Sequence, residues 1–271
     1  MSLAGVAKET VSIVECGSYT CPSGHVVNLR AELDAAIAGT VLYRPGDHDA
    51  LPPLPDGHGL PKIEVWADST GGAARRLAAE GPVAALVFAS AKNPGGGFMG
   101  GAKAQEEDIA RCSAHYHCVR TQRDYYASNR AGSSMLYTDH IIYAPAVPFF
   151  RDERLDLVDH PFLASLVTAP APNAGEHLRR EPDGHAAIAV ALRRRAGLVL
   201  RVLAHQQQRT LVLGAWGCGV FRNDPLAVAG VFKDWLNAPD FAGAFDRVVF
   251  AIYERGRDQP TVQAFQRVFD C

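Results

Sequence analysis

Six short segments of the chain are continuously apolar or nearly so. This pattern is typical of strands that are buried on both faces of a sheet. They are predicted at residues 62–67, 83–90, 140–147, 163–168, 209–214 and 247–253. Helix-like segments precede or separate these strands. They are predicted at residues 28–38, 72–79, from about 105, 184–206, 225–237 and 259–269, with Asp224 as the N-cap before Pro225.

Strands that alternate with helices indicate an α/β/α domain, in which a mostly parallel or mixed sheet is covered on both faces. Residues 44–61 are rich in Pro, Gly and Asp, and we expect loops there. The sequence therefore predicts an N-terminal extension at residues 1–60, packed on the core, and a single larger domain at residues 61–271. A chain of 271 residues is long enough for that arrangement.

Composition excludes several classes of protein. Hydrophobic residues make up 48% of the chain, which is enough to offset the entropy of ordering and excludes general disorder. No apolar run approaches the roughly 18 residues of a membrane span. The first residues lack a basic region followed by an apolar stretch, so we expect no secretory signal and a cytoplasmic protein. In that compartment the six cysteines are expected to be reduced.

The charges nearly cancel. Lys and Arg number 27 and Asp and Glu number 29, a formal net charge of −2. Such a balance gives no long-range attraction to nucleic acid or to an anionic membrane, so we expect no direct binding to either. The arginine clusters at residues 179–180 and 193–195 are predicted to be solvent-exposed helix faces.

The densest chemical signal extends from Asn93 to Glu107. Five glycines between Gly95 and Gly101 follow a predicted buried strand and precede a helix. Without Cβ atoms, such a backbone can direct successive N–H groups at one anion, and the helix N-terminus adds the positive end of its dipole. We therefore expect an anion-binding loop here, with a flexible surface turn as the alternative.

Neither standard nucleotide loop fits this segment. Gly95, Gly97 and Gly100 satisfy G-x-G-x-x-G, but that fingerprint also needs an acidic residue at the end of a second strand. The nearest candidate, Asp124, follows no apolar strand. The phosphate-loop pattern fails because Lys103 has alanine on both sides.

A second glycine loop, at residues 214–223, follows another predicted buried strand. Gly217 and Gly219 flank Cys218, and Phe221 comes two residues later. Two glycine loops at the carboxyl ends of two strands suit a pyrophosphate held between them. Phe221 could then cover a sugar or a base, or it could be a core residue that anchors the loop.

Glu106 and Glu107 lie where the helix after the first loop begins. Acidic residues in a first helical turn commonly do no more than stabilise the helix dipole. Beside a predicted anion-binding loop, however, a carboxylate repels the ligand unless it has a chemical role. Adjacent carboxylates also push their pKa values apart, which helps to keep one protonated as a general acid.

Metal and serine chemistry find little support in the sequence. Cys112, His115, His117 and Cys118 are spaced like metal ligands, but no second ligand cluster accompanies them, and we expect no metal site. G-x-S-x-G does not occur, so no serine nucleophile is predicted.

The pattern GGG-x7-QEE, at residues 95–107, resembles the catalytic loop of the poly(ADP-ribose) glycohydrolases. Residues 89–98, 143–152 and 214–221 are similar to the compact bacterial-type branch of that family and occur in its order, so the resemblance covers roughly residues 60–269. It implies a macrodomain-like three-layer α/β/α fold with a mixed sheet that binds ADP-ribose. The implied reaction is hydrolysis of ribose–ribose O-glycosidic bonds without a cofactor.

The resemblance also implies roles for individual residues. Glu107 would be the general acid and base, and Glu106 would bind the neighbouring ribose hydroxyls and orient the scissile bond. Substrate-binding roles fall on residues of the two loops. These residues are Asn93, Gly95, Gly96, Gly97, Gln105, Gly217, Cys218, Gly219, Val220 and Phe221.

Three functions stay open on the sequence. The first is a glycohydrolase that releases ADP-ribose from poly(ADP-ribose), with ADP-ribosylated proteins as substrates and a place in the DNA damage response. The second is a non-catalytic macrodomain that binds ADP-ribose and would not need Glu106 and Glu107. The third is a hydrolase of mono-ADP-ribosyl groups.

Overall fold

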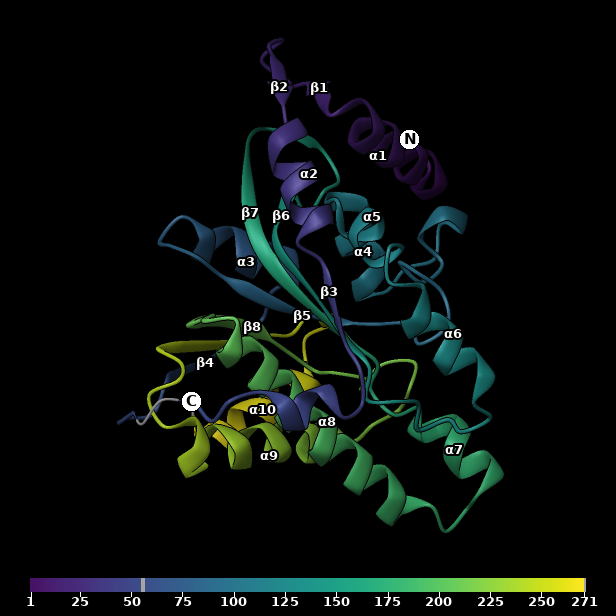
Figure 1. The fold of residues 1–271 in the computed structure, drawn as a ribbon, viewed down its shortest axis with the longest axis vertical. Coiled ribbons are helices and arrows are strands. Elements are labelled where there is room, and N and C mark those ends of the chain that lie inside the picture. Colours follow the sequence, from purple (N-terminus) through teal and green to yellow (C-terminus); the bar gives the residue numbers. More distant parts are fainter. Residues whose placement is uncertain (55–56, 271) are drawn as a thin grey trace.

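The computed structural model describes residues 1–54 and 57–270, and its centre is a seven-stranded mixed sheet (Figure 1). The strand order is β3-β6-β7-β5-β8-β9-β4. β7, β5, β8, β9 and β4 run parallel, whereas β6 is antiparallel to β7 and to β3. The bounds are β3 (Val41–Tyr43), β4 (Lys62–Trp66), β5 (Ala84–Phe88), β6 (Ile141–Arg151), β7 (Leu157–Ala169), β8 (Thr210–Leu213) and β9 (Arg247–Ala251). All six predicted strands are present.

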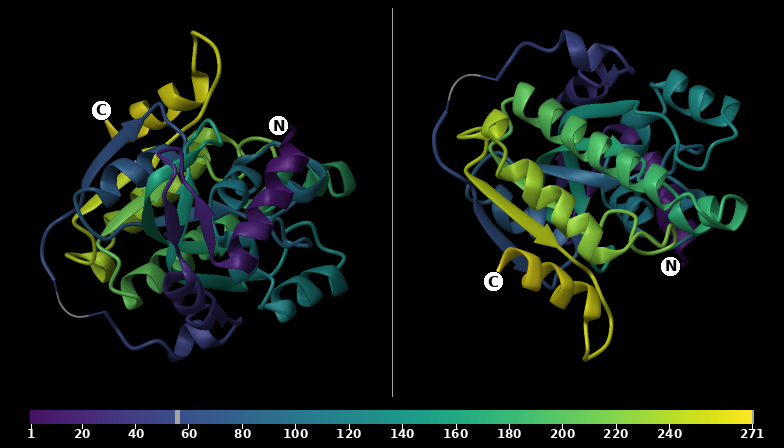
Figure 2. Two further views of the ribbon diagram at one scale, coloured as in Figure 1. Left: turned by 90° about the horizontal axis from the view of Figure 1, so that it is seen from above. Right: turned by 90° about the horizontal axis from the view of Figure 1, so that it is seen from below.

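Helices cover both faces of this sheet, so the predicted three-layer α/β/α architecture is confirmed (Figure 2). One layer packs as a single apolar cluster and contains α8 (His185–His205), α9 (Pro225–Leu236) and α10 (Pro260–Phe269). The opposite layer contains α1 (Leu3–Cys16), α2 (Arg30–Ala38), α3 (Thr70–Ala78), α4 (Gln105–Cys112) and α5 (His115–Val119). Two further helices are α6 (Arg123–Ala131) and α7 (Ala174–Arg180).

β5 shows why the strands read as apolar runs. Its Ala84 and Leu86 pack against the layer of α8 and α9, and its Ala85 and Val87 pack against the layer of α3 and α4. A strand that is buried on both faces needs apolar residues at every position. The predicted cap of α9 is also present, because the Asp224 side chain accepts a hydrogen bond from the N–H of Leu226.

The first 60 residues contribute more than a covering layer. They hold α1, a small hairpin of β1 (Ser18–Thr20) and β2 (Val26–Asn28), α2, and β3, which pairs with β6 at one edge of the central sheet. The sequence analysis missed β3 because it is three residues long and only Tyr43 is buried. The predicted loop at 44–61 contains a short 3-10 turn over Asp47–Ala50, and its residues 55–56 lie outside the described part.

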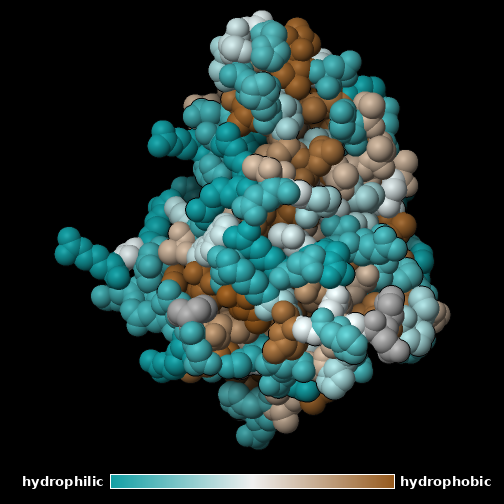
Figure 3. Space-filling view, turned by 90° about the vertical axis from the view of Figure 1, so that its left-hand side faces the viewer, coloured by the Kyte–Doolittle hydropathy of each residue, from teal (hydrophilic) through white to brown (hydrophobic). Residues whose placement is uncertain are grey.

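The surface is mainly polar, as expected for a chain whose apolar residues fill the interior. The face in Figure 3 is mostly hydrophilic, with apolar residues showing only in small areas. No helix of the described residues is long and apolar enough to cross a membrane. The five cysteines within residues 1–54 and 57–270 are free, and Cys271 lies outside that part.

The prediction that residues 193–195 form a solvent-exposed face is wrong for Arg195. Its side chain is wholly buried and pairs with Asp139 at 3.0 Å. Its guanidinium also donates to the carbonyl oxygens of Pro170, Leu136 and Tyr137. A buried cation persists where hydrogen bonds and an opposite charge offset the loss of hydration, and helical spacing alone does not reveal such partners.

Arg194 offers a matched control for this buried cation, because it binds the same Asp139 at 2.7 Å but is half-exposed. Arg195→Ala is expected to lower the free energy of unfolding by about 3 kcal/mol, since it leaves buried acceptors without a partner. Arg194→Ala is expected to lower it by less than about 1 kcal/mol. Urea denaturation measures both, and equal losses would contradict the assignment.

Candidate active site

The two glycine loops meet at one edge of the sheet. β5 and β8 are adjacent and parallel, so their carboxyl ends lie at the same edge. The first loop follows β5 and leads into α4, and the second follows β8 and leads into α9. This is where ligands bind in open α/β sheets.

The first loop turns sharply through two glycines in the left-handed region. Gly95 has φ +66° and Gly96 has φ +61°. A Cβ atom on Gly96 would clash with Oε1 of Glu107 and would lie 3.2 Å from Oε2 of Glu106. Phe98 is buried and packs its ring 4.8 Å from the ring of Tyr116, which anchors the turn. The glycines therefore let the two carboxyl groups approach the backbone closely.

The first N–H groups of this loop bind protein atoms. Gly96 donates to the carbonyl oxygen of Asn93 at 3.0 Å, and Gly97 donates to Oε1 of Glu107 at 2.9 Å. The expectation that this loop directs successive N–H groups at an anion is therefore wrong for Gly96 and Gly97. The loop instead positions the carboxyl groups of α4. Asn93 itself is exposed beside the turn.

Gln105 joins the start of α4 to the end of β5. Its Oε1 accepts from the N–H of Phe88 at 2.8 Å, and its Nε2 donates to the carbonyl oxygen of Leu86 at 2.7 Å and to Oγ1 of Thr70 at 3.0 Å. These bonds use both hydrogens of Nε2, so a further contact of the Gln105 amide would have to be accepted by the second lone pair of Oε1. The geometry thus gives Gln105 a positioning role for the two glutamates that follow it.

Glu106 is almost fully buried. Its Oε2 accepts from the N–H of Ser90 at 2.6 Å, and the backbone N–H of Gly95 favours its ionised form more weakly. Burial raises the pKa of Glu106 well above its ordinary value and neighbouring Glu107 raises it further, although the two backbone N–H groups oppose the rise. The sequence analysis did not single out Ser90, whose contribution comes from its main chain.

Glu107 lies next to the glycine turn on the same helical turn of α4. It is 9% exposed, and Gly97 holds its Oε1. Two carboxyl groups with different partners, adjacent at a helix N-terminus, are suited to acid–base work on one bond.

The second loop is fixed by side chains that the sequence analysis did not single out. Trp216 is fully buried and donates from Nε1 to the carbonyl oxygen of Ala169, and Asn223 donates to those of Pro172 and Gly217. Gly217 has φ +74°, and a Cβ there would lie 2.5 Å from Asn223.

Between these anchors the second loop presents open donors. Among the described residues, the N–H groups of Gly219, Val220 and Phe221 donate to no protein acceptor. Gly219 and Val220 are exposed, and a Cβ on Gly219 would meet nothing within 4 Å. Three successive N–H groups without a protein acceptor are suited to binding an anion. Burial raises the pKa of the Cys218 thiol to about 12, so Cys218 remains a neutral thiol.

Phe221 is partly buried against the main core, and its ring centre lies 5.9 Å from that of Tyr137. The ring thus has both core contacts and a partly accessible surface. Tyr137 had no signal in the sequence, because it comes from a loop more than 80 residues away.

Metal-binding side chains gather elsewhere. In the part of the chain that the structure describes, Cys112, His115, His117 and Cys118 do not form a ligand group. Cys21, His25 and Asp159 place their ligand atoms within 4.8 Å of one another, and the Ser23 hydroxyl already joins His25 and Asp159 at 2.8 Å each. These side chains lie at the β1–β2 hairpin and β7, and none comes from the two glycine loops.

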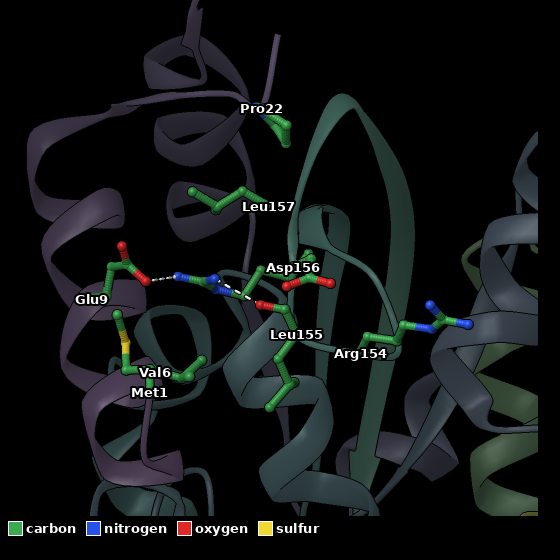
Figure 4. A pocket seen from close by; sticks show the side chains of 9 residues that line it. Met1, Val6, Glu9, Pro22, Arg154, Leu155, Asp156 and Leu157 are labelled. Carbon is green, nitrogen blue, oxygen red and sulfur yellow. Dashed lines mark hydrogen bonds and ion pairs between the residues drawn. The ribbon is translucent and has the colours of Figure 1, made fainter. Parts of the chain in front are cut away.

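A cavity of about 600 Å³ also lies apart from the glycine loops. It opens between α1 and the turn that joins β6 to β7, where Arg151 pairs with Glu9 (Figure 4). No predicted site residue lines it. The two glycine loops therefore remain the candidate active site.

Comparisons with known proteins agree with this geometry. The sequence model of the family described as "Microbial-type PARG, catalytic domain" matches residues 7–152. The structure of poly(ADP-ribose) glycohydrolase from Thermomonospora curvata is 43% identical, with a TM-score of 0.91 over 98% of this chain and 99% of that one. A comparison with curated proteins gave no match.

Two further structures contain ligands. The Thermomonospora curvata enzyme bound to the inhibitor ADP-HPD is 43% identical, with a TM-score of 0.89 over 98% of each chain. The enzyme from Deinococcus radiodurans in complex with ADP-ribose is 42% identical, with a TM-score of 0.82 over 90% of this chain and 98% of that one.

The fold and the paired carboxyl groups define a macrodomain-like glycosidase. The chain belongs to the family of microbial-type poly(ADP-ribose) glycohydrolases, since the family's catalytic-domain model matches more than half of it.

The glycine turn that holds Glu107 can be tested with alanine. Gly96→Ala is expected to displace the Glu107 carboxyl group and to lower the free energy of unfolding by about 1–2 kcal/mol, because φ is positive there. Gly100→Ala in the same loop is the control, since its Cβ meets nothing within 4 Å. Urea denaturation and crystal structures of both variants give the result. An undisturbed Glu107 in Gly96→Ala would refute the close approach.

Proposed function

We propose that the protein hydrolyses the ribose–ribose O-glycosidic bonds of poly(ADP-ribose) and releases ADP-ribose. The observation that carries this proposal is the position of Glu106 and Glu107 at the mouth of α4, where the backbone N–H groups of Ser90 and Gly97 hold their carboxyl groups. A module that only binds ADP-ribose would not need two carboxyl groups beside an anion.

In the proposed mechanism, Glu107 is the general acid and base. Cleavage of a glycosidic bond needs a proton on the leaving oxygen and stabilisation of an oxocarbenium-like centre. Glu107 would donate that proton, and the resulting carboxylate would then activate the incoming water. Both steps return the enzyme to its starting state and consume one water.

Glu106 would bind the hydroxyls of the neighbouring ribose and orient the scissile bond. Its Oε2 is fixed by Ser90 and lies near the turn at Gly96, so the carboxyl group has one orientation toward the loop. Fixed orientation of the reacting bond lowers the barrier because little freedom is lost on reaching the transition state.

The diphosphate would lie on the free N–H groups of Gly219, Val220 and Phe221, with the first loop closing over the ribose at Gly95–Gly97 and Asn93. The net charge of −2 supports this arrangement. A chain without a positive field must hold an anionic ligand through local donors.

The same reasoning extends to the surroundings of the reaction. We propose that the polymer is presented on ADP-ribosylated proteins in the cytoplasm, as part of the response to DNA damage. The balanced charge supports a substrate recognised by its ADP-ribose units, without direct binding to nucleic acid.

Glu107→Gln tests the proposed chemistry. The amide keeps the size of the side chain but cannot deliver a proton, so polymer hydrolysis is expected to fall at least about 10²- to 10⁴-fold. Affinity for ADP-ribose, measured by calorimetry, is expected to stay the same or to improve, because the amide keeps the shape of the side chain and an acceptor for the N–H of Gly97.

Asp108→Asn is the control for this experiment. Asp108 lies in the same first turn of α4 but is exposed and pairs with Arg111. We expect its hydrolysis rate to remain within twofold of the unmodified protein. Full hydrolysis by Glu107→Gln would refute the mechanism, and tight ADP-ribose binding by an inactive unmodified protein would indicate a binding module.

Phe221→Ala separates the two roles of this aromatic ring. If the ring covers the bound nucleotide, the dissociation constant for ADP-ribose rises by about tenfold, the loss of one stacked or buried aromatic contact. Calorimetry measures the affinity and thermal unfolding measures stability. Unchanged affinity together with a melting temperature several degrees lower would make Phe221 a core anchor only.

A further inference from the structure

A fully buried histidine faces the second oxygen of Glu106. Nε2 of His115, at the start of α5, lies 3.7 Å from Oε1 of Glu106, and their side chains are 0% and 3% exposed. Oε2 of the same carboxyl group turns to Ser90 and the glycine loop. Among the described residues, His115 is the only basic side chain within 4.0 Å of this carboxyl group.

These buried atoms have no other partner. Neither ring nitrogen of His115 nor Oε1 of Glu106 makes a hydrogen bond within the described residues. Burying an unpaired polar group costs free energy, whereas a leucine would fill similar space without that cost. A histidine in this position therefore calls for a reason other than stability.

Among the described residues, the other titratable groups that interact with Glu106 are Tyr125, Tyr126 and Glu107, and none of them carries a positive charge. Burial raises the pKa of Tyr125 and of Tyr126, both on α6, well above the ordinary value, and Glu107 lies beside Glu106 on α4. Burial also lowers the pKa of His115 to about 3, so its imidazole is neutral near pH 7. Arg195 favours the ionised form of Tyr125 and Arg130 that of Tyr126, but neither arginine forms an ion pair with Glu106.

We propose that His115 is the positioning partner of Glu106, holding Oε1 so that Oε2 keeps its orientation toward the glycine loop and the bound ribose. This inference rests on the proposed function of Glu106. An approach of about 0.7 Å would bring Nε2 and Oε1 to hydrogen-bond distance. Such bonds are often long in ligand-free sites and tighten when substrate binds.

A neutral imidazole suits this role in either protonation state of the carboxyl group. One ring nitrogen donates and the other accepts, and here no other partner fixes which is which. Nε2 can therefore donate a hydrogen bond to an ionised Glu106 or accept one from the O–H of a protonated Glu106. The orientation of the carboxyl group is kept in both cases.

His115→Leu separates positioning from a structural role. It is expected to lower kcat/KM for polymer hydrolysis about tenfold, the loss of one hydrogen bond to a charged group. Its free energy of unfolding is expected to stay the same or to rise, because two unpaired nitrogens leave the interior. His115→Gln, which keeps a donor and an acceptor, is expected to recover part of the loss in kcat/KM.

His117→Leu is the matched control. His117 lies on the same short helix and is 9% exposed, and its buried Nε2 has no hydrogen-bond partner among the described residues. Unlike His115, it forms no ion pair with Glu106. We expect its kcat/KM to remain within twofold of the unmodified protein. Activity of His115→Leu equal to that of the control, or a loss that follows a lower stability, would overturn the inference.

A double variant tests whether His115 acts through Glu106. Glu106→Gln/His115→Leu is expected to lose no more activity than Glu106→Gln alone, because the partner is already altered. Additive losses would overturn the inference.

A readout without turnover keeps the inference separate from the proposed function. The ¹⁵N signal of His115 Nε2, assigned by its absence in His115→Leu, is expected to shift in Glu106→Gln but not in Asp108→Asn. An unchanged signal overturns the pairing even in an active enzyme. If the signal shifts in Glu106→Gln while the unmodified protein cleaves no polymer, the function alone is contradicted.

Discussion

The geometry of the active site depends on the hydrogen bonds of a single amide. Gln105 completes the backbone pairing of β5 with two bonds and reaches α3 with a third, so the first residue of α4 is fixed to the sheet. Glu106 and Glu107 follow directly, and their positions relative to the glycine turn are set by this attachment. A helix that began one residue later would direct both carboxyl groups elsewhere, since each residue rotates by about 100° around the helix axis.

The two glycine loops use their backbone N–H groups differently. In the first loop the N–H groups of Gly96 and Gly97 are occupied by protein acceptors, one of them the Glu107 carboxyl group. In the second loop three N–H groups in a row stay free in the described structure. Glycine thus lets side chains approach the backbone closely in the first loop, whereas the second loop leaves N–H groups of three successive residues without a protein acceptor.

The sequence patterns predicted the long strands and helices and the residues of the candidate site, but not the residues that position them. The apolar runs of β5 and β8 predicted where the loops begin, because burial on both faces leaves a clear signature. β3 was not predicted because three residues are too few to show a hydrophobic pattern. The burial of Arg195 was not predicted because its partners, such as Asp139, lie far away in the sequence. Ser90 supplies a main-chain group, which no side-chain pattern marks, and His115 gains its meaning only from its distance to Glu106.

The free donors of the second loop belong to the main chain, and this affects how the site responds to its surroundings. Peptide N–H groups do not titrate in the physiological range, so the affinity of these donors for a diphosphate would not change with pH in that range. Side chains at Val220 could drift in evolution without removing a donor, since Val220 is exposed and its N–H is common to every residue except proline. Binding of this kind depends on the conformation of the backbone, so the sequence reveals it only through the residues that make the chain turn.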